Sequence, residues 1–339
     1  MKTILFLTLS SFLFLGCSKS SNNDEENIYT SNIYIAGYED ASNSIAKSWS
    51  NGVPTTLSGT NNGRGNDITV SGNDVYVAGY EINGPVGVAK LWKNGTATSL
   101  GAGTFYSEAT GVAVSGTDVY ACGYEFNSTY EEAKLWKNGT ATSLNSGPKD
   151  AEATSLFLSG ADVYVAGYEL SGTISVAKVW KNGVSSPLTN GINSAIANAI
   201  FVSGTDVYVG GIESNGTHDV AKVWKNGIAT SLSDGTTNAS VESVYISGSD
   251  VYASGYLENL GVHTGIIWKN GNELFRTTQG DDAIVFSVSV QGADVYATGY
   301  EAMGAFPFYM YVTWWKNGVA HHVTDGTHNA MGMDFFVKP

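Results

Sequence analysis

The stretch AKLWKNGTATSL, residues 89–100, occurs again without a change at residues 133–144, 44 positions further along the chain. Its Trp-Lys-Asn-Gly core marks a repeat with seven copies, six reading WKNG and the first WSNG. The recurring tryptophans are Trp49, Trp92, Trp136, Trp180, Trp224, Trp268 and Trp315. Five successive units, beginning at residues 71, 115, 159, 203 and 247, contain 44 residues each. A period in the forties is typical of β-propellers and of helical arrays.

The pattern inside one unit decides between these two architectures. Residues 108–144 contain four short runs rich in Val, Tyr, Trp and Thr, and no stretch with helical spacing. An SGxD motif supplies the first hairpin turn and Asn-Gly the second, in which a type I′ turn requires positive φ at both central positions. Four antiparallel strands per repeat of about 44 residues, seven times over, predict an all-β, seven-bladed β-propeller.

The two ends of the chain predict how the ring closes. Residues 31–58 supply three strands that lack a preceding first strand, whereas AMGMDFFV, residues 330–337, reads as a first strand with nothing after it. We therefore expect the N- and C-termini to build one blade together. Such closure leaves no sheet edge unpaired around the ring.

The composition excludes one class of partner. The 339 residues carry a formal net charge of -14, with 17 basic and 31 acidic side chains. Nucleic-acid binding needs clustered Lys and Arg, so we expect no nucleic-acid partner. The five histidines lack metal-ligand spacing and no cofactor motif is present, so we expect no metal, no cofactor and no catalytic residue that a motif could identify. The chain is expected to be a monomer.

The N-terminal segment predicts secretion. MKTILFLTLSSFLFLG, residues 1–16, has one Lys and an apolar run too short to span a bilayer comfortably, as in a signal peptide. Gly16-Cys17 resembles the lipobox of bacterial lipoproteins, although Phe14 and Leu15 depart from its usual residues. That resemblance implies lipid attachment at Cys17. Residues 17–27 are polar and read as a flexible tether, and the propeller is expected over residues 28–339.

A second resemblance concerns the repeats and the destination of the protein. The blocks DVYVAGYE and WKNG are similar to those of secreted bacterial seven-bladed propellers, which implies the fold but no particular activity. Ser18 is not the Asp that resembles an inner-membrane retention signal, so we expect the outer membrane. The acidic run at residues 24–26 weakly resembles signals for the cell surface, so the protein is expected to face either the surface or the periplasm.

Residues that recur in every blade are interpreted as structural. Trp is the large apolar residue of the third strand, and the Gly of GYE is expected to lie opposite it across the hairpin. Cys122 is expected to be a small buried residue, because most other repeats have Ala there. The Asp of SGxD is expected to accept backbone bonds in its turn. The Glu of GYE is expected to face the Lys two residues before Trp, in the pairs Glu39–Lys47, Glu81–Lys90, Glu125–Lys134, Glu169–Lys178 and Glu213–Lys222.

Candidate binding residues are the exceptions to the repeat. If both tight turns lie on one face, the variable loops emerge on the other, and binding residues usually sit on such loops. The segment between Glu301 and Trp315 is three residues longer than its counterpart between Glu81 and Trp92. It and two other loops supply the candidate ligand-binding aromatics Phe105, Tyr106, Tyr130, Phe306, Phe308 and Tyr309.

A second candidate is the mouth of the central channel. Five carboxylates are expected at or near it, with Arg64: Asp67, Glu108, Glu152, Glu242 and Asp334. Asp67 and Asp334 occupy the same repeat position in adjacent blades, so they are expected to lie close enough to share a cation or to titrate as a pair. These features favour a lipid-anchored envelope protein that binds a glycan or a protein through its loop face. The alternatives are a polysaccharide hydrolase or lyase that uses the carboxylates as acid and base, and a spacer without a ligand.

Overall fold

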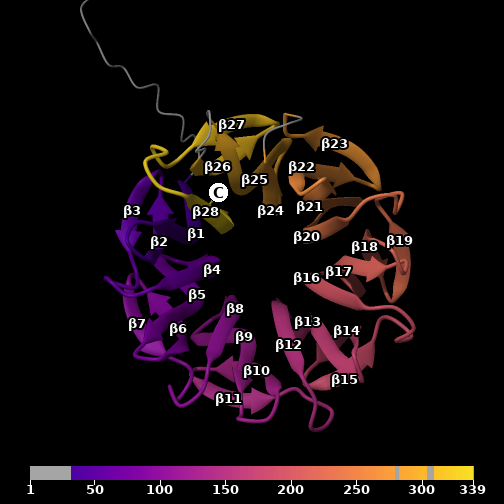
Figure 1. Cartoon of the computed structure of the whole chain (residues 1–339), viewed down its shortest axis with the longest axis horizontal. Coiled ribbons are helices and arrows are strands. Elements are labelled where there is room, and N and C mark those ends of the chain that lie inside the picture. Colours follow the sequence, from indigo (N-terminus) through magenta and orange to yellow (C-terminus); the bar gives the residue numbers. More distant parts are fainter. Residues whose placement is uncertain (1–31, 279–281, 304–308, 339) are drawn as a thin grey trace, which may run out of the picture. The chain divides into compact units, whose positions relative to one another are not determined.

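The computed structural model describes residues 32–278, 282–303 and 309–338. Its regular structure consists of 28 β-strands in seven four-stranded antiparallel sheets, which follow one another as blades around a ring (Figure 1). The predicted all-β, seven-bladed β-propeller is confirmed. No helix in the described ranges has the length and apolar character needed to cross a membrane.

Each blade takes its strands in chain order from the channel outward, except the first, which begins with the last strand of the chain. Blade 1 contains β28 (Ala330–Lys338), β1 (Asn32–Asp40), β2 (Ser44–Ser50) and β3 (Val53–Thr56). Blade 2 contains β4 (Gly63–Ser71), β5 (Asp74–Asn83), β6 (Val86–Lys93) and β7 (Thr96–Ser99). Blade 3 contains β8 (Ser107–Ser115), β9 (Asp118–Phe126), β10 (Glu131–Lys137) and β11 (Thr140–Ser143). Blade 4 contains β12 (Ala151–Ser159), β13 (Asp162–Ser171), β14 (Ile174–Lys181) and β15 (Val184–Pro187).

The remaining three blades repeat this plan. Blade 5 contains β16 (Ala195–Ser203), β17 (Asp206–Ser214), β18 (Asp219–Lys225) and β19 (Ile228–Ser231). Blade 6 contains β20 (Ala239–Ser247), β21 (Asp250–Asn259), β22 (Val262–Lys269) and β23 (Asn272–Arg276). Blade 7 contains β24 (Ala283–Gln291), β25 (Asp294–Met303), β26 (Tyr309–Lys316) and β27 (Val319–His322).

Blade 1 closes the ring as the sequence predicts. β28 pairs antiparallel with β1, and its register places Phe335 opposite Ile35 and Ala330 opposite Glu39. The last strand of the chain is therefore the inner strand of the blade that the N-terminal strands begin. Figure 1 shows β28, coloured yellow, next to the indigo strand β1.

The Asn-Gly turns have the backbone that the sequence predicts. Asn94 has a φ of 50° and Gly95 a φ of 80°, which is the left-handed pair of a type I′ turn. Both tight turns of a blade lie on one face, here called the turn face. The second-to-third-strand loops and the connections between blades lie on the opposite face, here called the loop face.

The Gly of GYE does not lie opposite Trp, so that expectation was wrong. Val77 pairs with Trp92, and Gly79 pairs with Lys90 two residues away. Gly is needed because the backbone of the inner strand lies very close to this position. A Cβ on Gly79 would lie 1.9 Å from the carbonyl oxygen of Arg64. A β-bulge in the inner strand brings that carbonyl close, and the same bulge recurs in every blade.

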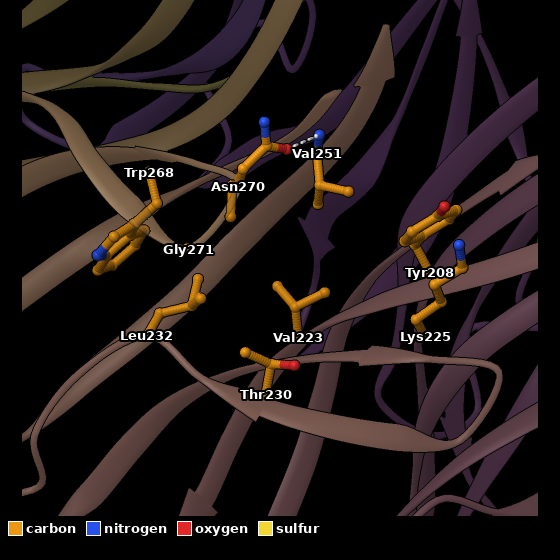
Figure 2. Close-up of a pocket in the computed structure, with 10 residues that line it drawn as sticks. Tyr208, Val223, Lys225, Thr230, Leu232, Val251, Trp268, Asn270 and Gly271 are labelled. Atoms are coloured by element: carbon orange, nitrogen blue, oxygen red, sulfur yellow. Dashed lines mark hydrogen bonds between the residues drawn. The ribbon is translucent and has the colours of Figure 1, made fainter. Parts of the chain in front are cut away.

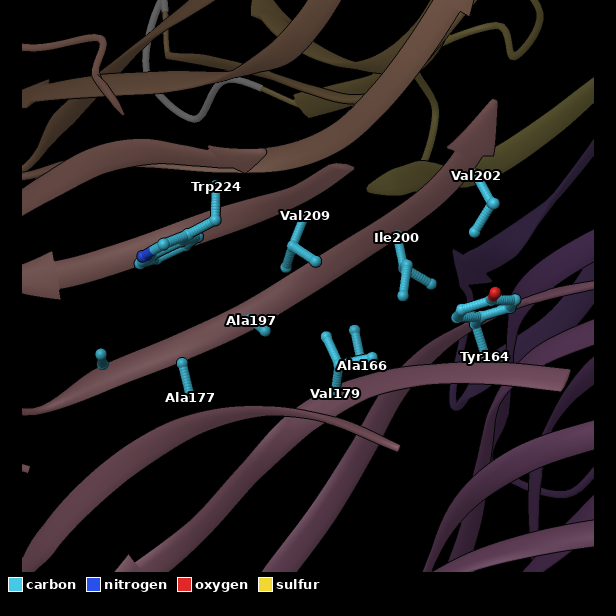
Figure 3. Close-up of a cluster of buried hydrophobic side chains, with 10 residues drawn as sticks. Tyr164, Ala166, Ala177, Val179, Ala197, Ile200, Val202, Val209 and Trp224 are labelled. Carbon is cyan, nitrogen blue, oxygen red and sulfur yellow. The ribbon is translucent and has the colours of Figure 1, made fainter. Parts of the chain in front are cut away.

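The hydrophobic core lies between neighbouring blades. Figure 3 shows one cluster, in which Ala177 and Val179 of blade 4 face Ile200, Val209 and Trp224 of blade 5. Other clusters place third-strand tryptophans the same way, which agrees with the structural role predicted for them. The thiol of Cys122 is buried in one of these clusters, as predicted, and burial raises its pKa to about 12.

The predicted Glu–Lys pairs form in all five blades. Lys222 Nζ lies 2.9 Å from Glu213, Lys90 lies 3.3 Å from Glu81 and Lys134 lies 4.0 Å from Glu125. Lys47 pairs with Glu39 and Lys178 with Glu169.

Blade 7 has Thr313 where five of the other blades have that Lys, and a side chain of the fourth strand approaches the same place. His322 Nδ1 lies 3.1 Å from the Thr313 hydroxyl and 3.9 Å from Glu301.

Candidate functional site

The turn face is nearly identical in blades 2 to 7. In blade 2, Lys93 and the side-chain amide of Asn94 each lie 2.7 Å from the Asp74 carboxylate, and Asn94 Oδ1 accepts the backbone N–H of Val75. Lys93 also lies 5.3 Å from the centre of the Tyr76 ring. Five further blades repeat the ion pair, at Asp118, Asp162, Asp206, Asp250 and Asp294. This repetition supports a structural role for the Asp, but the expected backbone bond was wrong: the Asp74 carboxylate contacts the side chains of Lys93 and Asn94, and Asn94 accepts the backbone N–H.

The inner strands present three levels of side chains along the channel. The first level is the loop-face mouth, one residue after each inner strand begins: Arg64, Glu108, Glu152, Ile196, Ser240, Ile284 and Met331. The second level is the belt, formed by the bulged residue and its successor. The third level is formed by the residue two positions after the second belt residue of each inner strand, and it lies near the turn face. The five predicted mouth carboxylates therefore divide, because Glu108 and Glu152 belong to the mouth whereas Asp67, Glu242 and Asp334 belong to the belt.

The mouth is charged on one side and apolar on much of the other. Blades 2, 3 and 4 contribute Arg64, Glu108 and Glu152, whereas blades 5 and 7 contribute Ile196 and Ile284. Met331 of blade 1 extends the apolar side. The mouth therefore has a charged arc from blades 2 to 4 and an arc from blades 5, 6, 7 and 1 in which Ser240 interrupts three apolar residues.

Glu108 is held by three hydrogen bonds. The phenols of Tyr106 and Tyr124 donate to its Oε2 at 2.7 and 3.1 Å, and Asn66 Nδ2 donates to Oε1 at 2.8 Å. Tyr106 lies in the connection before blade 3, and its ring covers the backbone of Gly87 in blade 2, where a Cβ would be 2.5 Å from the ring. The side chain of Glu108 is therefore fixed in position at the mouth.

Glu152 differs from Glu108 in its proton affinity. Tyr168 donates a 2.6 Å hydrogen bond to its Oε1. Burial, together with the nearby carboxylates Glu131 and Glu108, raises the pKa of Glu152 to about 7. The charged arc thus contains one fixed carboxylate and one carboxyl group that exchanges its proton near neutral pH.

The tyrosines of the GYE motif form a circle of aromatic side chains around this mouth. Register places Tyr80 opposite Arg64, Tyr124 opposite Glu108 and Tyr168 opposite Glu152. The other members are Tyr38, Tyr256 and Tyr300, with Ile212 in blade 5. Burial raises the pKa of these phenols, so they stay neutral and can donate hydrogen bonds. Sequence analysis missed this ring because a Tyr that recurs in most repeats is indistinguishable from a core residue.

Arg64 is the cation of the mouth. Its guanidinium lies 5.7 Å from the centre of the Tyr38 ring, and Nη2 lies 3.0 Å from the Met333 sulfur. Its Nε is buried and has no hydrogen-bond partner among the described residues. A buried donor without a partner is costly unless a ligand or water satisfies it.

The belt contains a series of polar contacts between neighbouring blades. All seven inner strands line it around a cavity of about 150 Å³. Asn66, Thr110, Thr154 and Asn198 are bulged residues, and each donates to a backbone carbonyl of the next blade at 2.6–2.9 Å. Glu242 occupies the same position in blade 6, and burial raises its pKa.

Asp67 and Asp334 meet in the belt, as predicted. Burial and the adjacent Asp334 carboxyl raise the pKa of Asp67. Val112 N donates to Asp67 Oδ2 at 2.5 Å, and Ile68 N donates to Asp334 Oδ2 at 3.2 Å. No group of three or more His, Cys, Asp or Glu side chains within the described ranges is arranged to hold a metal ion.

The aromatic residues predicted to bind a ligand do not form one site among the described residues. Phe105 packs edge-on against Phe126, and Tyr130 is half-buried in its own loop. Tyr309 is exposed at the start of β26 in blade 7, which blades 1 and 2 separate from the Tyr106 loop. Phe306 and Phe308 lie outside the described residues, as does Cys17. Of these aromatics, Tyr106 alone takes part in the described mouth.

A different cavity lies at the outer part of the ring. Figure 2 shows an apolar slot of about 220 Å³ between blades 5 and 6, lined by Val223, Leu232 and Trp268. Equivalent slots of about 310 and 220 Å³ occur between blades 6 and 7 and between blades 1 and 2. Because repeat residues line each slot, we interpret it as a property of blade packing.

Comparisons with known proteins show the fold and nothing finer. No protein-family model matches the chain, and no curated protein sequence matches it. Among solved structures, the chain is similar to an acylaminoacyl peptidase of Pyrococcus horikoshii, with a TM-score of 0.51 and 11% sequence identity. The likeness covers 87% of this chain and 50% of the peptidase chain. At this identity the likeness extends to the fold alone.

Proposed function

We propose that this protein is a binding module of the bacterial cell envelope, held to the outer membrane by lipid on Cys17, that recognises a glycan at its loop-face mouth. The observation that carries the proposal is the polarity of the mouth. Arg64, Glu108 and Glu152 stand on one side, and Ile196 and Ile284 stand on the other. A sugar ring has the matching character, with hydroxyl groups at its edge and apolar C–H faces.

The hydrogen-bonding groups suit hydroxyl ligands. Glu108 is held rigidly by Tyr106, Tyr124 and Asn66, so a ligand meets a preorganised acceptor. Arg64 Nε is a buried donor that lacks a partner within the described part of the chain. A ligand oxygen that accepts from it removes the cost of leaving it unpaired.

The charge of the chain narrows the glycan class. With a net charge of -14 and two carboxylates at the mouth, the protein repels polyanionic glycans. Neutral sugars and amino sugars avoid that repulsion. A screen of the soluble fragment 28–339 against neutral, amino-sugar and uronic-acid glycans tests the class. We expect saturable binding of the first or second group. Binding confined to uronic-acid glycans would overturn the charge argument, and binding to none of the three groups would overturn the glycan proposal.

A hydrolase or lyase is the second candidate, and one observation favours it. A carboxyl group with a pKa of about 7, such as Glu152, suits a general acid, and the Glu108 carboxylate lies near enough to influence it. Incubation of the glycans that bind with wild-type protein and with Glu152→Gln decides the question. An enzyme loses turnover in the variant while its affinity changes little, whereas a binding module forms no product in either case. A spacer shows neither binding nor turnover.

A further inference from the structure

The third level of the channel, near the turn face, forms an aromatic arc with one gap. Three neighbouring blades contribute Phe157, Phe201 and Tyr245 at the same repeat position. The ring centres of Phe157 and Phe201 are 4.6 Å apart, and those of Phe201 and Tyr245 are 5.1 Å apart. Blade 7 follows with Ser289, and blade 1 contributes Phe336. A Ser therefore stands where the arc would otherwise continue from Tyr245 to Phe336.

The gap at Ser289 is a cavity and not a filled contact. Its volume is about 620 Å³, and side chains of blades 6, 7 and 1 line it, among them Tyr245, Ser287, Ser289 and Phe336. That volume lies within the range of about 300–1,000 Å³ typical of small-molecule sites. Gln291 and Gly292, next to the turn-face hairpin turn, also line it. The cavity therefore lies toward the turn face, at the other end of the channel from the loop-face mouth.

The lining has a defined chemistry. Its residues are Ser, Val, Tyr, Gln, Gly and Phe, with no charged side chain among them. The hydroxyl of Ser289 is buried and has no hydrogen-bond partner among the described residues. A charged ligand would lose its hydration without gaining a counter-charge, whereas a neutral ligand with one polar group satisfies the orphan hydroxyl.

We propose that this cavity, here called the turn-face chamber, binds a small neutral aromatic molecule that carries one hydrogen-bonding group. Its ring takes the place left open between Tyr245 and Phe336, where offset or edge-to-face aromatic contacts extend the existing arc. Its polar group bonds to Ser289 Oγ. The turn-face chamber is independent of the glycan site, since it shares no residue with the loop-face mouth.

Indole tests the proposal, because it is planar, neutral and has one N–H donor. Saturation-transfer NMR with the purified chain measures its binding, and three probes of similar size provide the comparison: benzamidine as a cation, benzoate as an anion and cyclohexanol as a non-planar alcohol. We expect saturable binding of indole and roughly tenfold weaker binding of each of the other three. Equal binding of indole and cyclohexanol would contradict the aromatic assignment.

Substitutions locate the binding. Ser289→Phe closes the gap and should abolish indole binding, whereas Ser289→Ala keeps the space and should weaken binding roughly threefold through loss of the hydroxyl. Ala113→Phe is the matched control, because Ala113 holds the same repeat position in blade 3. It should leave binding unchanged. Unaltered binding in both Ser289 variants, or loss of binding in Ala113→Phe alone, would overturn the proposal. Ser289→Ala keeps the test valid if the larger side chain impairs folding.

Discussion

Asp67 of blade 2 and Asp334 of blade 1 accept the same backbone N–H, that of Ile68, at 2.8 and 3.2 Å, where the last strand of the chain meets the first complete blade. Asp67 also accepts the backbone N–H of Val112 in blade 3. Belt residues therefore connect blade 1, which the two chain ends form, to blade 2. Two neighbouring carboxyl groups cannot both ionise without cost, and with burial this raises the pKa of Asp67.

Removing the charge from this pair should stabilise the protein at neutral pH. Burial and Asp334 raise the folded-state pKa of Asp67, so the folded state keeps a proton that the unfolded state has lost. The contribution of Asp67 to stability is therefore complete below its unfolded-state pKa. It is lost as the pH rises from that value through its folded-state pKa. Asp67→Asn should raise the melting temperature more at pH 7 than at pH 4. Asp74→Asn on the turn face is the control, and an equal response of both variants to pH would contradict this explanation.

Glu242 interrupts the series of side-chain bonds in the belt. At the same repeat position Asn198 donates to Val241 O at 2.9 Å, linking blades 5 and 6. Glu242→Asn should let blade 6 form the equivalent bond to Val285 O and should remove a buried carboxyl group. We expect an increase of about 1 kcal/mol in the free energy of unfolding, measured by urea denaturation. Asn198→Ala should lower it by a similar amount. A destabilised Glu242→Asn protein would show that the carboxyl group has another role.

Deleting residues 330–339 should damage the ring far more than trimming residues 18–27. The first deletion removes β28 and leaves β1 without the partner strand that now pairs with Ile33 to Glu39. The second removes only part of the predicted tether. Thermal melts followed by circular dichroism compare the two. Similar melting temperatures would contradict a closure that contributes to stability.

The membrane anchor is tested at Cys17. If lipid on this residue holds the protein, Cys17→Ala should move it from the membrane fraction to the soluble fraction. Metabolic labelling with a fatty acid should mark the wild-type chain and not the variant. A wild-type chain that takes up no label would remove the anchor from the proposal.

The repeat made the fold predictable, because Asn-Gly turns and alternating strands are local signals. The shared blade was equally visible, since β28 has no partner near it in sequence. The levels of the channel were not predictable. The β-bulge after Gly65 adds a residue to the inner strand, which changes the face on which later side chains lie. Glu242 and Asp67 were expected near the mouth with Glu108, although they stand two and three repeat positions further along the strand, and the structure puts them deeper.

The role of the Gly in GYE could not be predicted from sequence either. Its reason is the bulged inner strand and the carbonyl of Arg64, a contact between strands that no pattern within GYE reveals. The tyrosine ring was also missed, because its function depends on register with Glu108 and Glu152 in the neighbouring strand. Single positions could be interpreted from sequence, but pairs of positions across a bulge could not.

A matched pair of double variants tests the central claim, glycan binding at the loop-face mouth. Glu108→Gln with Glu152→Gln removes two carboxylates from the mouth. Asp118→Asn with Asp162→Asn removes two from the same blades at the turn face. Isothermal titration calorimetry with a glycan identified by the screen should give at least roughly tenfold weaker affinity for the mouth variant and wild-type affinity for the turn-face variant. Equal affinities of the two variants would contradict the claim.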